Sequence, residues 1–425
     1  MRKHCIFLFL FLATMFVQSQ TVSTSSQNNT KQDSLRRRAF ITNIGNGYFP
    51  TKYFNFDLRY LVKFNQYEGF RTGLGAITND AFSNRYRVNG YLSYGFRDNR
   101  FKYSIGGGTR VRPRSNTWIN AAYTDDLQET GSSTFLTDKR FFQLFQPRLL
   151  NIDLFHRLIN RTISLEHRIS PHLLSEIQLA STDVLPTYSY LFFVDNQFYH
   201  DFDLTTSIVS LQWSPFSRYE YVNDKLKELK KGFPQFTLQY TQSYKDIFGG
   251  NFNFLKLDFR SIYQIEYPNA SVTKFTLRAG IAKGKTPLTH LYHTYPNNIT
   301  KETILQRFSV AGLNSFETMY FNEFFSDRFT TLQLKHFFKP FKITERYQPQ
   351  LVLITRYAVG DMDHIDRHQN VTFGTLDKGY TESGLEINKL LFGFGLSFAY
   401  RYGAYHLPRE EDNIALKFTF NLTLR

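Results

Sequence analysis

The residues best suited to bind a metal ion are gathered in one short stretch, GDMDHIDRH. It contains Asp361, Asp363, His364, Asp366 and His368. Carboxylates and imidazoles this close together could hold a divalent cation, or bridge lipopolysaccharide through one. Their spacing matches no defined calcium loop, so a polar external loop is the simpler interpretation. We therefore assign no metal site and keep these residues as weak candidates.

Motifs for covalent or phosphate chemistry are absent from the sequence. It has no Gly-x-Ser-x-Gly elbow, no His-Glu-x-x-His pair and no phosphate-binding loop. His290 and His293 fall in a long predicted loop, where ordinary packing explains two histidines three residues apart. The single cysteine, Cys5, lies in the predicted export segment. We expect a protein that is not an enzyme and has no cofactor.

Five charged residues remain as candidates for a site inside the fold. Arg59, Arg260, Arg278 and Arg401 lie on the polar face of predicted strands, so they would line a lumen and favour anions. Glu317 follows a loop motif, and it could pair with a luminal arginine such as Arg278 or Arg401 if that loop folds inward. Such a pair would fix the position of the loop more than it would stabilise the fold. Ordinary solvated charges are the alternative.

Amphipathic strands are the elements that would position these residues. In residues 392–402 and 414–424, large apolar side chains alternate with small or polar ones. A helix would scatter the apolar residues around its surface, whereas a strand places them on one face. We count about 16 such segments. They start near residues 53, 68, 85, 100, 117, 161, 172, 203, 235, 252, 273, 327, 350, 379, 391 and 413.

Composition favours a transmembrane barrel over a soluble sheet protein. Aromatic residues make up 17% of the chain, with 45 Phe and 27 Tyr, yet the mean hydropathy is −0.37. A barrel in lipid needs apolar side chains outside and polar ones inside, and this alternation keeps the mean low. The net charge of +15 then fits a basic lumen and anionic lipid head groups better than nucleic acid. We predict an all-β fold, a transmembrane antiparallel β-barrel of about 16 strands.

The chain divides into three predicted parts. Residues 1–19 have a basic start and a short apolar run, which indicates a cleaved signal peptide. Residues 20–50 form a polar leader or periplasmic linker that we expect to be short and disordered. Residues 51–425 form the barrel, and an even number of strands puts both termini in the periplasm.

Loop lengths follow the same topology. The long connections 127–160, 182–202, 284–326 and 359–378 fall outside the cell. Residues 214–234 break this rule because they are long but periplasmic, and their DKLKELKK core predicts a short charged surface helix.

Three stretches carry a family resemblance: residues 68–108, 309–329 and 377–424. They resemble the barrel of a Bacteroidetes outer-membrane family of unknown function. Members of that family usually place a carboxypeptidase-regulatory-like domain before the barrel, and this chain has no room for it between residue 19 and the first strand. The chain is then a barrel-only member or a truncated or split gene.

A more distant resemblance is to the BamA-like superfamily of assembly and two-partner-secretion barrels. Those barrels have 16 strands and an inward-folded sixth external loop, which corresponds here to 284–326. In place of the Arg-Gly-aromatic tip of that loop stand Phe316, Glu317 and Thr318. The periplasmic polypeptide-binding domains of that superfamily are also missing, which weakens any insertase or secretion role.

These patterns predict a cell outer-membrane protein of a Gram-negative bacterium. We expect a non-enzymatic BamA-like barrel that serves envelope assembly, transport or scaffolding. The alternative is a passive anion-preferring pore, and the choice depends on whether residues 284–326 plug the lumen. Expected partners are outer-membrane lipids, lipopolysaccharide and the barrel-assembly machinery, without nucleic acid.

Overall fold

The computed structural model describes residues 37, 40–138, 147–222, 225–303, 306–307, 309–344, 347–391 and 393–420. The predicted signal peptide and the predicted leader as far as residue 36 lie outside them. The end of the predicted leader is ordered, since residues 40–45 are helical and β1 (Tyr48–Pro50) pairs with β2. None of the described helices is long and apolar enough to cross a membrane.

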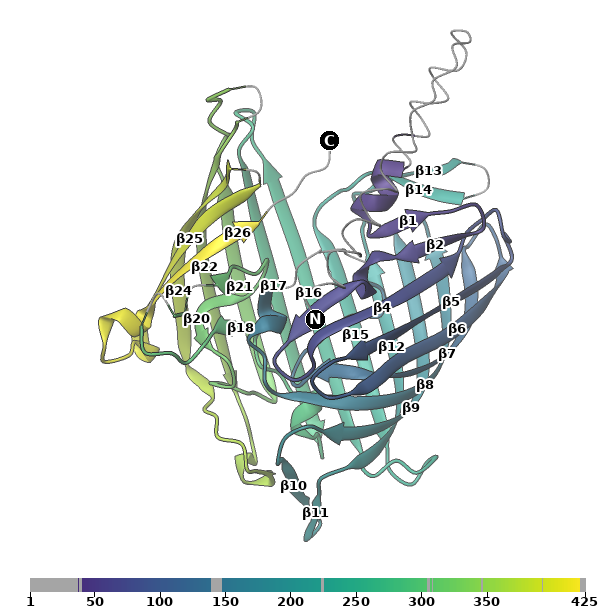
Figure 1. The fold of residues 1–425 in the computed structure, drawn as a ribbon, viewed down its shortest axis with the longest axis horizontal. Coiled ribbons are helices and arrows are strands. Elements are labelled where there is room, and N and C mark those ends of the chain that lie inside the picture. The colour runs from purple at the N-terminus through teal and green to yellow at the C-terminus, as the bar shows by residue number, and fades with distance from the viewer. Residues whose placement is uncertain are drawn as a thin grey trace, which may run out of the picture.

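One large sheet dominates the fold (Figure 1). After β1, its strands are β2 (Phe54–Asp57), β3 (Val62–Asn65), β4 (Gly69–Thr78), β5 (Tyr86–Gly95), β6 (Arg100–Arg112), β7 (Thr117–Glu129), β8 (Phe155–Ser170), β9 (Leu173–Pro186), β12 (Phe202–Trp213), β15 (Gln235–Tyr244), β16 (Phe254–Glu266), β17 (Val272–Gly284), β19 (Ser309–Val310), β21 (Arg328–Phe337), β22 (Gln350–Asp361), β24 (Leu376–Leu391), β25 (Phe394–Tyr402) and β26 (Ile414–Phe420).

Shorter elements lie in the connections. The strands are β10 (Leu191–Val194), β11 (Gln197–Tyr199), β13 (Arg218–Val222), β14 (Lys225–Lys230), β18 (Pro296–Asn298), β20 (Phe316–Tyr320) and β23 (His368–Gln369). The 3-10 helices are η1 (Leu58–Tyr60), η2 (Pro147–Leu150), η3 (Leu288–His290), η4 (Ile365–Arg367), η5 (Gly403–Tyr405) and η6 (Glu410–Asn413).

The sheet is an up-and-down antiparallel meander that curves around an interior. Strands β2 and β3, joined by η1, pair with the two ends of β4. From β4 to β26 each long strand then pairs with the next long strand in the chain, through β12, β15 and β21 to β25. Each predicted strand segment coincides with a strand of this meander. The largest shift is at β8, which starts at residue 155 where the pattern predicted 161.

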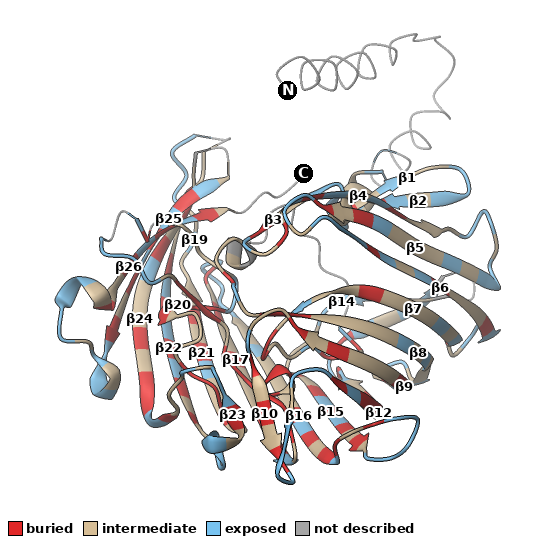
Figure 2. Ribbon diagram, turned by 60° about the horizontal axis from the view of Figure 1, so that its bottom comes forward, coloured by how far each residue is buried: buried red, intermediate tan, exposed pale blue. Residues whose placement is uncertain are grey.

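Side-chain burial alternates along the strands in the sense expected for a barrel with a polar interior (Figure 2). In β26, Lys417 is 1% exposed and faces inward, whereas its neighbours Leu416 and Phe418 are each 40% exposed on the outer face. Ile163 on β8 and Leu179 on β9 are likewise exposed outside. The sheet thus presents apolar residues outward and buries polar ones, the reverse of a soluble sheet.

The two ends of the sheet do not pair with each other. Within the described residues no hydrogen-bonded pairing joins β26 to β1, β2 or β3. Instead, the short strand β19 pairs in parallel with β26, Ser309 opposite Lys417. Helix η2 contacts both β3 and β19. This seam is therefore filled by pieces of two loops.

The short charged surface helix predicted for the DKLKELKK core of residues 214–234 is wrong. Strands β13 and β14 form an antiparallel hairpin there, with Tyr219 opposite Glu228 and Tyr221 opposite Leu226. Lys, Leu and Glu favour helices intrinsically, but cross-strand contacts with two tyrosines decide the local structure.

Candidate functional site: the luminal loop and its charged anchor

Residues 285–327, here called the luminal loop, connect β17 to β21 and fold into the interior of the sheet. Most side chains of residues 286–298 and 315–319 are buried. Within the loop, β18 pairs in parallel with β20, and Figure 2 places β20 inside the curved wall. The loop thus builds its own small folded unit within the lumen.

Apolar contacts hold the first part of this loop. Leu288 is fully buried, and Tyr292 is 1% exposed. The Tyr292 ring lies 4.5 Å from the ring of Phe329 on β21, and Lys256 Nζ of β16 lies 4.4 Å from its centroid. These residues belong to a core that also includes Phe254. The first part of the loop is therefore buried in an apolar core that it shares with the wall.

The carboxylate of Glu382 on β24 anchors the second part. It accepts hydrogen bonds from the backbone N–H groups of Glu317 and Thr318 at 3.0 and 2.9 Å. It also accepts the Thr318 hydroxyl and Arg356 Nη1, each at 2.5 Å. Glu382 is fully buried and Arg356 is 2% exposed. A buried carboxylate with this many donors holds the loop backbone in one position.

Strand register explains why these charges meet. Glu382 on β24 lies opposite Arg356 on β22 and opposite Arg401 on β25. The three side chains therefore form a row of alternating charge across neighbouring strands. Arg401, 1% exposed, pairs with Glu323 of the luminal loop at 2.7 Å. Its guanidinium lies 4.8 Å from the Tyr380 ring centroid.

Glu317 lies inside the lumen, but its partner differs from the two arginines named in the sequence-based hypothesis. Its carboxylate accepts from Asn297 Nδ2 at 2.7 Å and from Ser315 Oγ at 2.8 Å, and it lies 3.8 Å from Lys417 Nζ. Burial raises the pKa of Glu317, and the Lys417 ammonium opposes that shift. Arg278 instead stacks on the loop residue Tyr295, at 4.8 Å.

Lys417 ties the luminal loop to the last strand. Its ammonium donates to the backbone carbonyl of Asn297 and to Ser309 Oγ, the latter at 2.9 Å. Next to it, the backbone N–H of Ala311 donates to the Phe418 carbonyl at 2.7 Å. The loop therefore occupies both the inner face and part of the free edge of β26.

A second polar contact joins the luminal loop to the loop after β7. His293 Nε2 lies 2.6 Å from Glu129 Oε1, and Arg148 pairs with the same carboxylate. Arg148 Nε donates to the Pro296 carbonyl at 2.9 Å. Burial lowers the pKa of His293, and the carboxylate partner opposes that effect.

The other predicted luminal arginines also have partners. Arg260 pairs with Asp138 of the loop after β7, and its guanidinium lies 4.6 Å from the Phe135 ring centroid. Arg59 lies in η1 and pairs with Asp57 at 2.8 Å. Three of the four predicted arginines are therefore paired with carboxylates, and Arg278 contacts the ring of Tyr295. Among the described residues these four do not form a free basic lining.

The structure separates the weak metal candidates. Asp361 and Asp363 both pair with Arg328, at 2.5 and 3.0 Å. His368 is buried, and its Nδ1 accepts the Tyr190 hydroxyl at 2.9 Å. The other two candidates, His364 and Asp366, are exposed. In the part of the chain that the structure describes, no three His, Cys, Asp or Glu side chains are grouped to hold a metal.

Sequence reasoning did not find the residues at the centre of the anchor, Arg356, Glu382 and Lys417. All three lie at inward positions of amphipathic strands. A charged residue at such a position is unremarkable in a water-filled lumen, so only the inward fold of the loop singles them out. One sequence feature could have pointed to this wall. Glu386 lies four residues after Glu382, so both carboxylates fall on the inward face of β24.

The all-β meander with an inward loop defines a barrel-type fold, and comparison with solved structures agrees. BamA from Haemophilus ducreyi lacking POTRA domains 1-3 is similar, with a TM-score of 0.53 and 10% sequence identity over 86% of this chain and 69% of that chain. At this identity the likeness concerns the fold alone.

Sequence comparison then gives the family. Residues 45–345 match the model described as "Family of unknown function (DUF5686) C-terminal domain". The chain belongs to this family. A search of curated proteins finds no match.

Proposed function

We propose that this chain is a non-enzymatic barrel of the outer membrane of a Gram-negative bacterium, of the Bacteroidetes, that serves envelope assembly, transport or scaffolding. With β2 and β3 taken as one bent strand, the wall has about 16 strands, a number common among bacterial barrels. In the membrane we expect the two sheet ends to meet, because lipid does not tolerate open edges.

Exposed apolar residues on the outer face support the membrane location. Phe394, Leu396 and Phe398 on β25 and Phe418 on β26 are each at least 36% exposed. A continuous apolar band of this kind is unfavourable in water and favourable against lipid acyl chains. Export by the predicted signal peptide would bring the chain to this membrane.

The anchored luminal loop is the observation that favours this role over a passive pore. A pore needs free space and free charges along its axis. Here the loop fills part of the interior, and Arg260, Arg278 and Arg401 are engaged. We therefore rank the anion-preferring pore second.

Single-channel recording of the refolded mature chain in a planar lipid bilayer tests this ranking. We expect wild-type protein to be silent or to open rarely. Replacing residues 289–325 by a short Gly-Ser linker should give steady ohmic conductance, because that change removes the loop, including β19 at the seam, and leaves the long strands of the meander. A matched control shortens the β13–β14 hairpin, which lies at the other end of the barrel, and should stay silent.

Two outcomes would contradict the proposal. Steady anion-preferring conductance of the wild-type chain would support the pore. A loop-deleted variant that keeps the heat-modifiable gel mobility of a folded barrel, yet stays silent, would mean that something other than this loop closes the lumen.

The expected partners need a separate test. Pull-down of tagged protein from native outer membranes should recover assembly or secretion factors with lipopolysaccharide if the role is assembly or transport. We also propose that the chain has no hydrolase activity. Labelling by a serine-reactive fluorophosphonate probe, or lipid hydrolysis by the purified protein, would overturn that part.

A further inference from the structure

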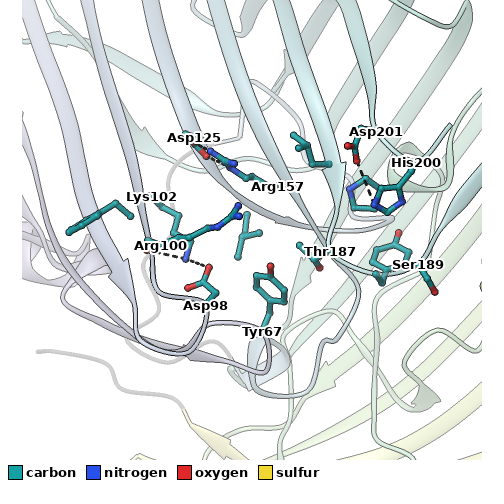
Figure 3. A pocket seen from close by; sticks show the side chains of 15 residues that line it. Tyr67, Asp98, Arg100, Lys102, Asp125, Arg157, Thr187, Ser189, His200 and Asp201 are labelled. Carbon is teal, nitrogen blue, oxygen red and sulfur yellow. Dashed lines mark hydrogen bonds and ion pairs between the residues drawn. The ribbon is translucent and has the colours of Figure 1, made fainter.

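A cavity of about 520 Å³ lies at the rim of the sheet, at one end of β6–β9 and away from the charged anchor (Figure 3). Its residues Arg157 and Leu185 share the outward face of their strands with Ile163 and Leu179. Its lining comes from the start of β6 and β8 and from the end of β7 and β9, so it opens at the end of the barrel that carries the long loops. The volume is in the range of small-molecule sites. Tyr67, Arg100, Leu127, Arg157 and Asp201 are the lining residues that matter here.

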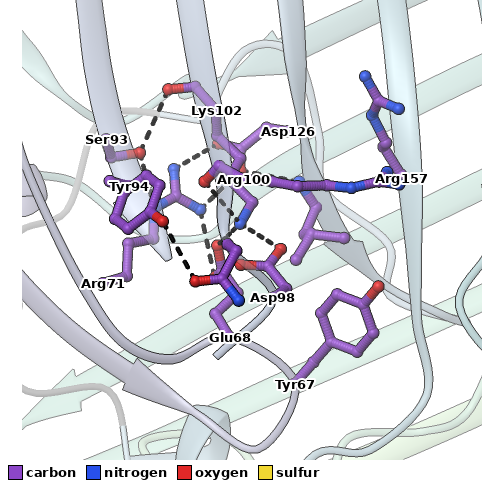
Figure 4. Close-up of polar contacts among 12 residues, drawn as sticks. Tyr67, Glu68, Arg71, Ser93, Tyr94, Asp98, Arg100, Lys102, Asp126 and Arg157 are labelled. Atoms are coloured by element: carbon purple, nitrogen blue, oxygen red, sulfur yellow. Dashed lines mark hydrogen bonds and ion pairs between the residues drawn. The ribbon is translucent and has the colours of Figure 1, made fainter. Parts of the chain in front are cut away.

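Most cations around this cavity are neutralised by fixed carboxylates (Figure 4). Lys102 pairs with Asp98 at 2.5 Å and with Glu68 at 2.7 Å. Arg71 pairs with Asp126 at 2.6 Å. These groups are buried, and each of the two cations is already held by two carboxylates, so neither is available to a ligand.

Arg100 is different. Its side chain is exposed, and within the described residues its guanidinium has no ion pair or hydrogen bond. Figure 4 shows it extending toward Arg157, which is held in place by Asp125 at 2.5 Å. Two guanidinium groups thus line the same cavity, and of the two Arg100 is the one without a carboxylate partner among the described residues. An anion between them would relieve their repulsion and gain charge-assisted hydrogen bonds.

The opposite side of the cavity carries a hydrogen-bond acceptor, the carboxylate of Asp201. His200 and Asp201 lie there, and His200 is fixed by its Nδ1, 2.8 Å from the Tyr190 carbonyl. The Asp201 carboxylate is well exposed and can accept hydrogen bonds from hydroxyl groups. Between the two sides, Tyr67, Leu127 and Leu185 offer ring and apolar contacts.

We propose that this cavity binds a small hydroxylated carboxylate, of the size and chemistry of a sugar acid. The carboxylate would lie between Arg100 and Arg157, and a hydroxyl group would donate to Asp201. The inference depends on the fold and not on the proposed membrane role, so it is tested on the full chain in detergent and stands if the conductance test fails.

Titration calorimetry with glucuronate and with glucose tests the proposal. We expect glucuronate to bind at least about tenfold more tightly than glucose, because only glucuronate carries the charge that Arg100 and Arg157 recognise. Arg100→Gln should weaken glucuronate binding by about tenfold or more. The same substitution of Arg161 is the matched control. Arg161 lies four residues after Arg157 on the same face of β8, outside the cavity, and pairs with Asp183 at 2.9 Å.

The control variant should bind glucuronate within about twofold of wild type. Equal affinity for glucose and glucuronate, or no measurable heat with either, would overturn the proposal. The proposal would also be overturned if Arg161→Gln lost as much affinity as Arg100→Gln. Binding would then depend on the overall positive charge and not on Arg100. Heat-modifiable gel mobility checks that each variant is folded.

Discussion

On the wall formed by β22–β26, the charged residues Arg356, Glu382 and Lys417 are at most 2% exposed, and the luminal loop covers them. On the wall formed by β4–β8, Arg100 is exposed and borders an open cavity. Both walls have the same inward polar pattern. The luminal loop covers the first group, whereas Arg100 lies at the rim beyond the loop. Its neighbours Arg71 and Lys102 on the same wall are buried in ion pairs.

This contrast separates two uses of inward charge. A charge covered by a loop is desolvated, so it must be paired and any loss of its partner is costly. A charge that borders a water-filled cavity keeps its hydration and stays available to a ligand. The covered anchor residues and the exposed Arg100 should therefore respond very differently to the same kind of substitution.

Removal of the central carboxylate should have the largest effect. Glu382→Ala leaves Arg356 buried without its ion pair and removes the acceptor of two loop N–H groups. We expect a loss of about 3–5 kcal/mol in the free energy of unfolding. Urea unfolding of the protein in lipid vesicles measures it.

Two variants calibrate this result. Glu382→Gln keeps a carbonyl acceptor and should lose about half as much. Asp183→Ala breaks the exposed pair with Arg161 and should cost less than about 1 kcal/mol. Similar losses for Asp183→Ala and Glu382→Ala would remove the distinction between covered and exposed ion pairs.

Acidification should destabilise the protein at the buried contact of Tyr190 with His368 and Leu288. The Tyr190 hydroxyl accepts from the Leu288 N–H at 3.0 Å and donates to His368 Nδ1. Burial lowers the pKa of His368 to about 4, below its unfolded value of about 6.5. The unfolded chain thus binds the proton first, so the contribution of this histidine is complete above pH 6.5 and is lost as pH falls toward 4.

The expected loss from this histidine is about 3 kcal/mol in the free energy of unfolding by pH 4. Other groups also titrate in this range, so the measurement is the difference between wild type and His368→Asn. The asparagine can accept the Tyr190 hydroxyl but does not titrate. Identical pH profiles of the two proteins would show that His368 is hydrated in solution.

The link between the loop and the last strand should have a smaller effect. Lys417→Met removes the bonds to the Asn297 carbonyl and Ser309 Oγ. We expect a loss of about 1–2 kcal/mol and faster protease cleavage within the luminal loop. Lys283→Met, an exposed lysine at the end of β17, is the matched control. Equal cleavage rates in both variants would mean that Lys417 does not hold the loop.

The smallest effect should be at the open wall. Arg100→Gln removes an exposed cation that has no partner among the described residues, so the free energy of unfolding should change by less than about 0.5 kcal/mol. A loss of 2 kcal/mol or more would place Arg100 in a buried contact and would erase the contrast with Arg356.

The strands could be predicted from sequence because their signal is local. Period-2 alternation in stretches such as 414–420 depends only on neighbouring residues, and it places each strand within a few residues. The hairpin at 218–230 was missed because its lysines and leucines have helical propensity and its stabilising tyrosines lie on another strand. Local signals cannot report that pairing.

The site could be predicted only in part. Sequence reasoning identified the loop that folds inward and named Glu317, but it named the wrong partners for that carboxylate. The cation nearest to Glu317 is decided by strand register and by the point where the loop turns back. Neither can be predicted from the spacing of residues in the sequence. The same limit applies to Asp361 and His368, close in sequence but directed to different neighbours.

The position of the anchor in the chain has a consequence for the order of folding. Arg356, Glu382, Arg401 and Lys417 all follow the luminal loop in sequence and lie on β22, β24, β25 and β26. The loop therefore has no polar partner on this wall until the final strands have paired, which makes its docking a late, non-local event. We therefore expect the loop to fill the lumen only after the last strands have been added. A barrel that stalls before β24 would be left with its loop loose and its interior open to water.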